Sequence, residues 1–263
     1  MNFRRILAGM LRTVRYLFRR TFYLAAMSTE CVACAVRPSS WVAPVRARFS
    51  RQVLFGGVEA IPFTIFVAAL IGIVATLNSF KWLEYTGKLD SLGPAVAILV
   101  IREAAPFFAC VIIICASASA ITTELATMRV TGEIDLIEGQ GINLLHYLVM
   151  PRAVGLAVAG LGLAAVFVTF AFLSAALVIL ILGRIPPGPF FESIVRSLDL
   201  ADILNFIGRS AVPSFLIAGI CCYEGLSVVG PVTVVPQAVT RAMLRSVAVT
   251  LIISAAFALL TYL

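Results

Sequence analysis

The chain has 263 residues, of which 61% are hydrophobic and only 13% are charged. Soluble domains carry about 25% charged residues, so this composition excludes a soluble globular protein and indicates an integral membrane protein. Several apolar stretches reach 20 residues or more, which suits membrane-spanning helices rather than the roughly ten-residue alternating strands of a barrel. We therefore predict an all-α integral membrane protein.

The first predicted region, residues 1–56, is strongly basic. Ten of the 20 Lys and Arg residues of the chain precede residue 52, and Glu30 is the only acid among them. Such an excess of positive charge beside membrane spans places the N-terminus in the cytoplasm. Anionic lipid headgroups, and no nucleic acid, are its expected partners. We predict an amphipathic interfacial helix over residues 3–20 and a second short one over about 41–54.

The second predicted region, residues 57–263, contains five apolar segments that are each long enough to cross a bilayer. The third segment is too short for two crossings joined by a turn, so we expect one long, tilted helix. A short helix outside the membrane is expected within the connection 183–202. The predicted spans are about 57–78, 92–122, 147–182, 203–223 and 242–263.

Five spans that start from a cytoplasmic N-terminus place the C-terminus on the opposite side of the membrane. The connections 123–146 and 224–241 are then cytoplasmic, whereas 79–91 and 183–202 are external. The connection 123–146 is acidic, but acidic residues contribute little to orientation, so the basic N-terminal region is expected to decide it.

An adjacent pair of opposite charges, Arg102 and Glu103, lies inside the second apolar segment. Neighbouring residues of a helix point about 100° apart, so each side chain is expected to meet a partner on another helix, a headgroup or water. The pair is either a structural ion pair or part of a polar site in a lipid or substrate cavity. Pro106 loosens the helix nearby, which favours the cavity.

Residues 123–140 alternate charged and apolar positions, and Gly132 breaks them into two expected short helices. The apolar positions Leu125, Met128, Ile134 and Ile137 can share a face. The segment is either a solvated loop or a docking helix for a soluble subunit, and its apolar content favours docking.

The remaining candidate residues carry weaker signals. Glu59 and Glu224 are expected near span ends, the single histidine His146 lacks ligand partners, and Cys31 and Cys34 form one isolated C-x-x-C. We therefore predict no metal site. No G-x-x-x-x-G-K-[ST] loop and no catalytic motif is present, so we expect no enzyme and no ATPase site in this chain.

Between Arg102 and Arg152 the chain resembles the MlaE-type (also called YrbE) permease subunits of ABC transporters that move lipids between membranes. Weaker similarity extends over residues 50–260. In the second span, Ala104-Ala105-Pro106 and the stretch 116–119 depart from the family pattern, as in a divergent member. The matching residues are Arg102, Glu103 and Pro106; Thr123-Glu124-Leu125; Thr127-Met128-Arg129-Val130-Thr131; Glu133-Ile134-Asp135; Glu138; and Pro151-Arg152.

The resemblance implies a homodimeric permease in the bacterial inner membrane, with the C-terminus in the periplasm. It implies as partners a cytoplasmic ABC ATPase that uses the ATP, a periplasmic MCE-domain protein and, in some systems, a small STAS-domain protein. No cofactor is expected in the permease itself. Carried over to this chain, the lipid cavity would include Arg102, Glu103 and Pro106. The ATPase-coupling residues would be Glu124, Arg129, Glu133, Asp135 and Glu138.

The leading hypothesis is therefore a permease that moves phospholipid between the inner membrane and an MCE-type partner. An ion-coupled secondary transporter or channel that uses the intramembrane Arg102 and Glu103 is the alternative. This alternative predicts transport without an ATPase, driven by a proton or sodium gradient. A non-transporting membrane scaffold is a third possibility, which predicts partners but no cavity.

Overall fold

The computed structural model describes residues 27, 29–35, 42–87, 92–182 and 187–262. Within these ranges every regular element is a helix, so the prediction of an all-α protein is confirmed. The predicted amphipathic helix over residues 3–20 lies outside the described residues. Five helical stretches of the described chain are long and apolar enough to cross a membrane. They are Ala43–Tyr85, Leu92–Val130, Leu145–Leu182, Leu200–Leu226 and Val232–Thr261.

The first stretch joins two elements that the sequence suggested as separate. Helix α2 (Ala43–Gly56) corresponds to the second interfacial helix, and a 3-10 turn, η2 (Val58–Ala60), leads directly from it into α3 (Ile61–Thr86). The predicted connection 79–91 was therefore too long, because α3 continues through its first half. Gly87 ends the helix with a φ of 68°, a left-handed conformation that suits glycine.

The second stretch contains two wide turns of π-helix. It runs through α4 (Leu92–Ala97), the π-helical η4 (Ile98–Ala104), α5 (Ala105–Ile113), the π-helical η5 (Ile114–Ala118) and α6 (Ser119–Val130). Arg102 and Glu103 lie in η4, and Pro106 is buried in the first turn of α5. Such bulges often mark functional sites, and the wide turn ends beside Pro106, where the sequence predicted a loosened helix.

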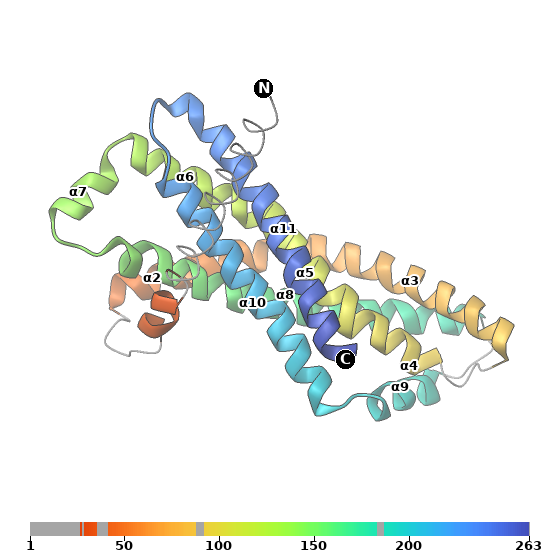
Figure 1. Cartoon of the computed structure of the whole chain (residues 1–263). Coiled ribbons are helices and arrows are strands. Elements are labelled where there is room, and N and C mark those ends of the chain that lie inside the picture. Colours follow the sequence, from red (N-terminus) through yellow and green to blue (C-terminus); the bar gives the residue numbers. More distant parts are fainter. Residues whose placement is uncertain (1–26, 28, 36–41, 88–91, 183–186, 263) are drawn as a thin grey trace, which may run out of the picture.

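The predicted coupling segment divides at Gly132, whose φ is 80°. However, residues 123–130 are not a separate short helix, because they belong to α6 and prolong the second span. The second half is the separate helix α7 (Glu133–Gly139). In Figure 1, α7 projects beyond the other helices at one end of the bundle, whereas α3, α4 and α9 (Pro187–Arg196) meet at the other end.

The last three predicted spans are present, but their ends differ from the predicted ones. A π-helical turn, η6 (Leu145–Val149), leads into the single long helix α8 (Met150–Leu182), and α9 is the expected short helix in the connection 183–202. The predicted connection 224–241 shrinks to residues 227–231. The reason is that α10 (Leu200–Leu226) ends late and η7 (Val232–Val234) leads early into α11 (Val235–Tyr262).

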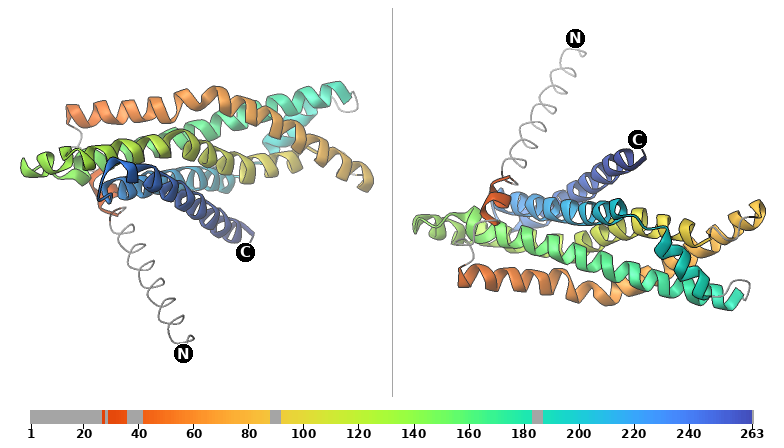
Figure 2. Two further views of the ribbon diagram at one scale, coloured as in Figure 1. Left: turned by 90° about the horizontal axis from the view of Figure 1, so that it is seen from above. Right: turned by 90° about the horizontal axis from the view of Figure 1, so that it is seen from below.

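Helix α8 is the centre of the bundle, since α2, α3, α5 and α10 all pack along it. Small residues permit the closest approaches. A Cβ atom at Gly72 of α3 would overlap the carbonyl oxygen of Ala171 in α8. Close backbone packing of this kind is the usual basis of helix association in membranes. Helix α11 packs on α10 and α6, and its C-terminal part leans away from the other helices in Figure 2 while Thr261 keeps contact with α10.

Gly72→Ala should destabilise the protein by about 1–3 kcal/mol, the usual cost of overpacking, because the methyl group would meet backbone atoms of α8. Thermal unfolding of the purified protein in detergent should show a lower midpoint. Gly162→Ala is the matched control on α8, because a Cβ atom there meets nothing within 4 Å. Equal midpoints for the two variants would contradict the close contact of α3 with α8.

Candidate functional site

The intramembrane charges of η4 face helix α10, and each has a partner there. The guanidinium of Arg209 forms two parallel bonds to the carboxylate of Glu103, from Nη1 to Oε1 at 2.8 Å and from Nη2 to Oε2 at 2.5 Å. Its Nη1 also donates to the backbone carbonyl of Arg102 at 2.5 Å. This forked geometry is the strong form of an Arg–carboxylate pair, and it fixes α10 against η4.

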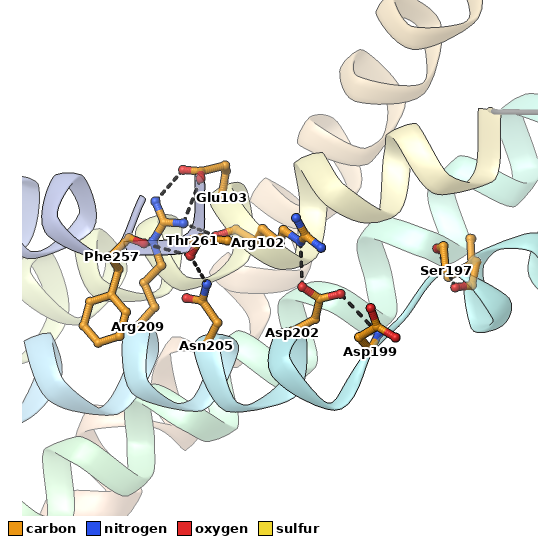
Figure 3. A network of polar contacts seen from close by, with 10 residues as sticks. Arg102, Glu103, Ser197, Asp199, Asp202, Asn205, Arg209, Phe257 and Thr261 are labelled. Carbon is orange, nitrogen blue, oxygen red and sulfur yellow. Dashed lines mark hydrogen bonds and ion pairs between the residues drawn. The ribbon is translucent and has the colours of Figure 1, made fainter. Parts of the chain in front are cut away.

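A second pair lies nearby and joins the same two elements. Arg102 Nε is 2.7 Å from Oδ1 of Asp202, whose other oxygen accepts a hydrogen bond from the backbone N–H of Asp199 at 3.2 Å. On the same side of α10, the amide of Asn205 donates to the hydroxyl of Thr261 in α11. Figure 3 shows these side chains as one polar network across η4, α10 and α11.

Burial makes this network important for stability. The side chain of Arg209 is only 3% exposed and that of Asp202 is 6% exposed, whereas Arg102 and Glu103 keep 23% and 38% of their side-chain surface. A buried guanidinium without a counter-charge costs several kcal/mol. The pairs therefore cancel the charge within the span, while Arg102 and Glu103 stay partly exposed.

Sequence reasoning placed Arg102 and Glu103 but missed their partners. Arg209 was detectable, because an arginine inside an apolar span is itself an indication of a functional or paired site. Asp202 was assigned to a connection rather than to the first turn of a span. Pro106 shares the region but is buried, so it shapes the helix rather than the surface.

Helix α7, the second half of the coupling segment, is held by a buried side chain and by an ion pair with α6. Ile134 of α7 is fully buried against the main core, and Arg129 at the end of α6 contacts Asp135 of α7, with Nη1 and Oδ1 2.8 Å apart. The carboxylates of Glu133, Asp135 and Glu138 are exposed. Leu136 is 69% exposed beside them. Helix α7 therefore presents a firmly anchored surface with acidic and apolar side chains.

Glu124 lies apart from this surface. It belongs to α6 and forms an ion pair with Arg152 of α8, with 2.8 Å between Oε1 and Nη2. Glu224 lies in the last turn of α10, near a span end as predicted, but its side chain is only 2% exposed and accepts a hydrogen bond from Arg245 of α11. The structure therefore divides the five predicted coupling residues. Four of them lie around α7, and Glu124 lies in the contact between α6 and α8.

The C-x-x-C pair lies on a short helical segment within residues 29–35. Cys31 is buried in the main core, and this burial, together with nearby Cys34 and Glu30, raises the pKa of its thiol to about 12. A thiol with such a pKa stays protonated and is a poor metal ligand or nucleophile. Across the described residues, no group of three His, Cys, Asp or Glu side chains could hold a metal ion. His146 lies in η6.

Five apolar spans, an anchored helix projecting at one end and a charge-neutral polar network within the spans define a multi-pass membrane protein of the permease type. The family model described as Permease MlaE matches residues 49–260. The chain belongs to this family and is an ABC transporter permease.

Proteins named as probable ABC transporter permeases from several organisms are similar along most of this chain. One from Synechocystis sp. is 28% identical over 197 residues, which is 74% of each chain. One from the red alga Pyropia yezoensis is 27% identical over 67% of each chain. One from Rickettsia typhi is 24% identical over 76% of each chain. The predicted class, a permease subunit of an ABC transporter, is therefore confirmed. A permease of this class implies an ATPase partner.

Glu103→Gln should destabilise the protein by about 2 kcal/mol, because it leaves the buried Arg209 without its counter-charge. The expected loss of stability is smaller than for breaking a fully buried ion pair, because Glu103 is partly exposed. Glu192→Gln, which breaks the exposed pair with Arg196 on α9, is the control and should cost less than about 1 kcal/mol.

Thermal unfolding of the single variants and of Glu103→Gln/Arg209→Gln completes a double-mutant cycle. The stability lost by the double variant should be clearly smaller than the sum of the losses of the two single variants, because neither charge is then left without its partner. Strict additivity would show that the bond between Glu103 and Arg209 contributes nothing to stability.

Proposed function

We propose that this permease moves phospholipid between the bacterial inner membrane and a periplasmic MCE-type protein, driven by a separate cytoplasmic ATPase. The observation that carries this proposal is α7. It is a short helix outside the span, anchored by Ile134 and Arg129, and its exposed face offers carboxylates and Leu136 to a soluble partner. ATP binding and hydrolysis on the partner would move α7 and, through the unbroken α6, the second span.

Charge distribution supports a cytoplasmic location for the α7 end. This end carries Arg46, Arg48 and Arg51 of α2, and the helix ends of α6, α8 and α11 add further arginines. Described cations are sparse at the end formed by α3, α4 and α9, where Lys81 and Arg196 lie. The positive-inside rule then orients α7 toward the cytoplasm and the C-terminus toward the periplasm.

The polar network on η4 supports a lipid cavity between two copies of the chain. The partly exposed edges of Arg102 and Glu103 could meet a lipid headgroup, while their pairing with α10 keeps the span neutral. The pairing also weighs against the alternative of an ion-coupled transporter or channel, because both carboxylates of the network are already bound to guanidinium groups. Helix α11 offers an apolar surface to a second copy, since Ile252 and Leu260 are 67% and 78% exposed. A STAS-domain protein on the ATPase remains an expectation from the family resemblance.

Reversing the charges of α7 with Glu133→Lys/Asp135→Lys should weaken ATPase association at least about tenfold, equivalent to 1.4 kcal/mol. Co-purification from cells and ATPase stimulation in reconstituted membranes measure this effect. Glu192→Lys on α9 is the control, because it changes an exposed carboxylate at the opposite end. Unchanged association of the α7 variant would disprove docking at this helix.

Arg102→Ala/Glu103→Ala should lower the phospholipid that co-purifies with the transporter several-fold, because it removes the polar edges of the proposed cavity. Mass spectrometry of extracted lipid measures the occupancy, and thermal unfolding shows that the variant is folded. Glu192→Ala/Arg196→Ala removes an exposed ion pair on α9 and serves as the control. Normal occupancy in the η4 variant would remove these residues from the cavity. Transport that follows an ion gradient without ATPase would favour the alternative function.

A further inference from the structure

A cavity of about 430 Å³ opens at the α7 end of the bundle, away from the network on η4. Its walls come from α2, η2, the stretch of η5 and α6, and the start of α8. The helices approach closely here: a Cβ atom at Gly56 would lie 3.0 Å from Ser117 Oγ, and one at Gly155 would lie 3.0 Å from Gln52 Cβ. Close packing of α2 on α8 therefore shapes the cavity.

Two buried polar atoms in this cavity lack a hydrogen-bond partner in the described protein. They are Nη1 of Arg152 and the hydroxyl oxygen of Ser117. The side chain of Arg152 is only 5% exposed, and its Nη2 is already used by Glu124. A buried polar group without a partner destabilises the fold, because it has given up its hydrogen bonds to water. A ligand with acceptor oxygens in the cavity would satisfy both atoms.

The cavity is basic. Three arginines, Arg48, Arg51 and Arg152, line it together with two carboxylates, those of Glu59 and Glu124. Because Glu124 is paired with Arg152, only the carboxylate of Glu59 is left to balance the guanidinium groups of Arg48 and Arg51. An anion is the ligand that this balance favours.

Both further arginines are held by aromatic rings. The Arg48 guanidinium lies 4.1 Å from the ring centre of Tyr147, and that of Arg51 lies 5.5 Å from the ring centre of Phe55. Stacking uses the flat face of a guanidinium and leaves its N–H edge available, which matches the geometry of phosphate oxygens.

An apolar stripe continues from the cavity along the first span. Phe63, Phe66, Leu70 and Val74 follow Glu59 at steps of four, three, four and four residues, so they lie on one face of α3. Their side chains are 57%, 61%, 48% and 53% exposed. A ligand that fits both features carries a phosphate at one end and hydrocarbon chains at the other.

We propose that this cavity is a second lipid site, in which an anionic phospholipid of the α7-side leaflet places its phosphate against Arg48, Arg51 and Arg152 and its acyl chains along α3. This resident lipid is distinct from cargo at the η4 network, and the proposal holds whether or not the protein transports phospholipid. Because Glu124 shares Arg152 with the ligand, an occupied site steadies α6, the helix that carries α7. Lipid composition would thereby influence the coupling segment.

The test uses the full-length protein in nanodiscs of phosphatidylcholine, with or without phosphatidylglycerol, analysed by native mass spectrometry. The wild type should retain one phosphatidylglycerol per chain. Arg48→Gln/Arg51→Gln should retain at least about fivefold less, whereas Arg46→Gln/Arg196→Gln, with the same loss of charge at exposed positions outside the cavity, should behave as the wild type. Arg152 is kept intact, because its loss would strand Glu124.

Equal loss of phosphatidylglycerol in both double variants would overturn the proposal, since retention would then follow net charge. Equal retention of phosphatidylcholine and phosphatidylglycerol by the wild type would also overturn it. A further arm adds millimolar inorganic phosphate to nanodiscs of phosphatidylcholine alone and follows thermal stability. If phosphate raises the unfolding midpoint of the wild type as much as phosphatidylglycerol does, and leaves Arg48→Gln/Arg51→Gln unchanged, a free anion replaces the lipid as the ligand.

Discussion

The need to neutralise Arg209 within a membrane span governs the middle of this structure. A guanidinium that is 97% buried by the surrounding helices requires a carboxylate in the same layer, and Glu103 of η4 provides it. Once these two side chains are bonded, the height and rotation of α10 against the second span are set. Arg102 and Asp202 form a second pair about two turns further along α10, so the two helices are joined at two points rather than one.

The same rule operates at the α7 end, with different consequences. Glu124 and Arg152 join α6 to α8, and Glu224 with Arg245 joins α10 to α11. These pairs lie where the helices approach the interface, so water and headgroups can reach part of each. Charge is fully balanced at the η4 network, whereas the cavity beside Arg152 keeps a positive balance.

Continuity of the second span links the two ends mechanically. No loop separates η4 from Val130, so a displacement of α7 reaches Arg102 and Glu103 through one helical path that contains two π-helical turns. π-Helical turns of this kind occur frequently at functional sites, and η4 carries the polar network itself.

Local properties of the sequence were sufficient for the helical class, the five spans and the break at Gly132. Each of these depends on hydropathy, periodicity or backbone preference within a few neighbouring residues. Helix ends were placed less well, because polar residues such as Asp202 and Glu224 continue a helix when another helix supplies a counter-charge. Only the tertiary structure decided that Glu103 meets Arg209, 106 residues away, and that Arg48, Arg51 and Arg152 border one cavity. These contacts depend on how helices pack against each other, and no local pattern contains that information.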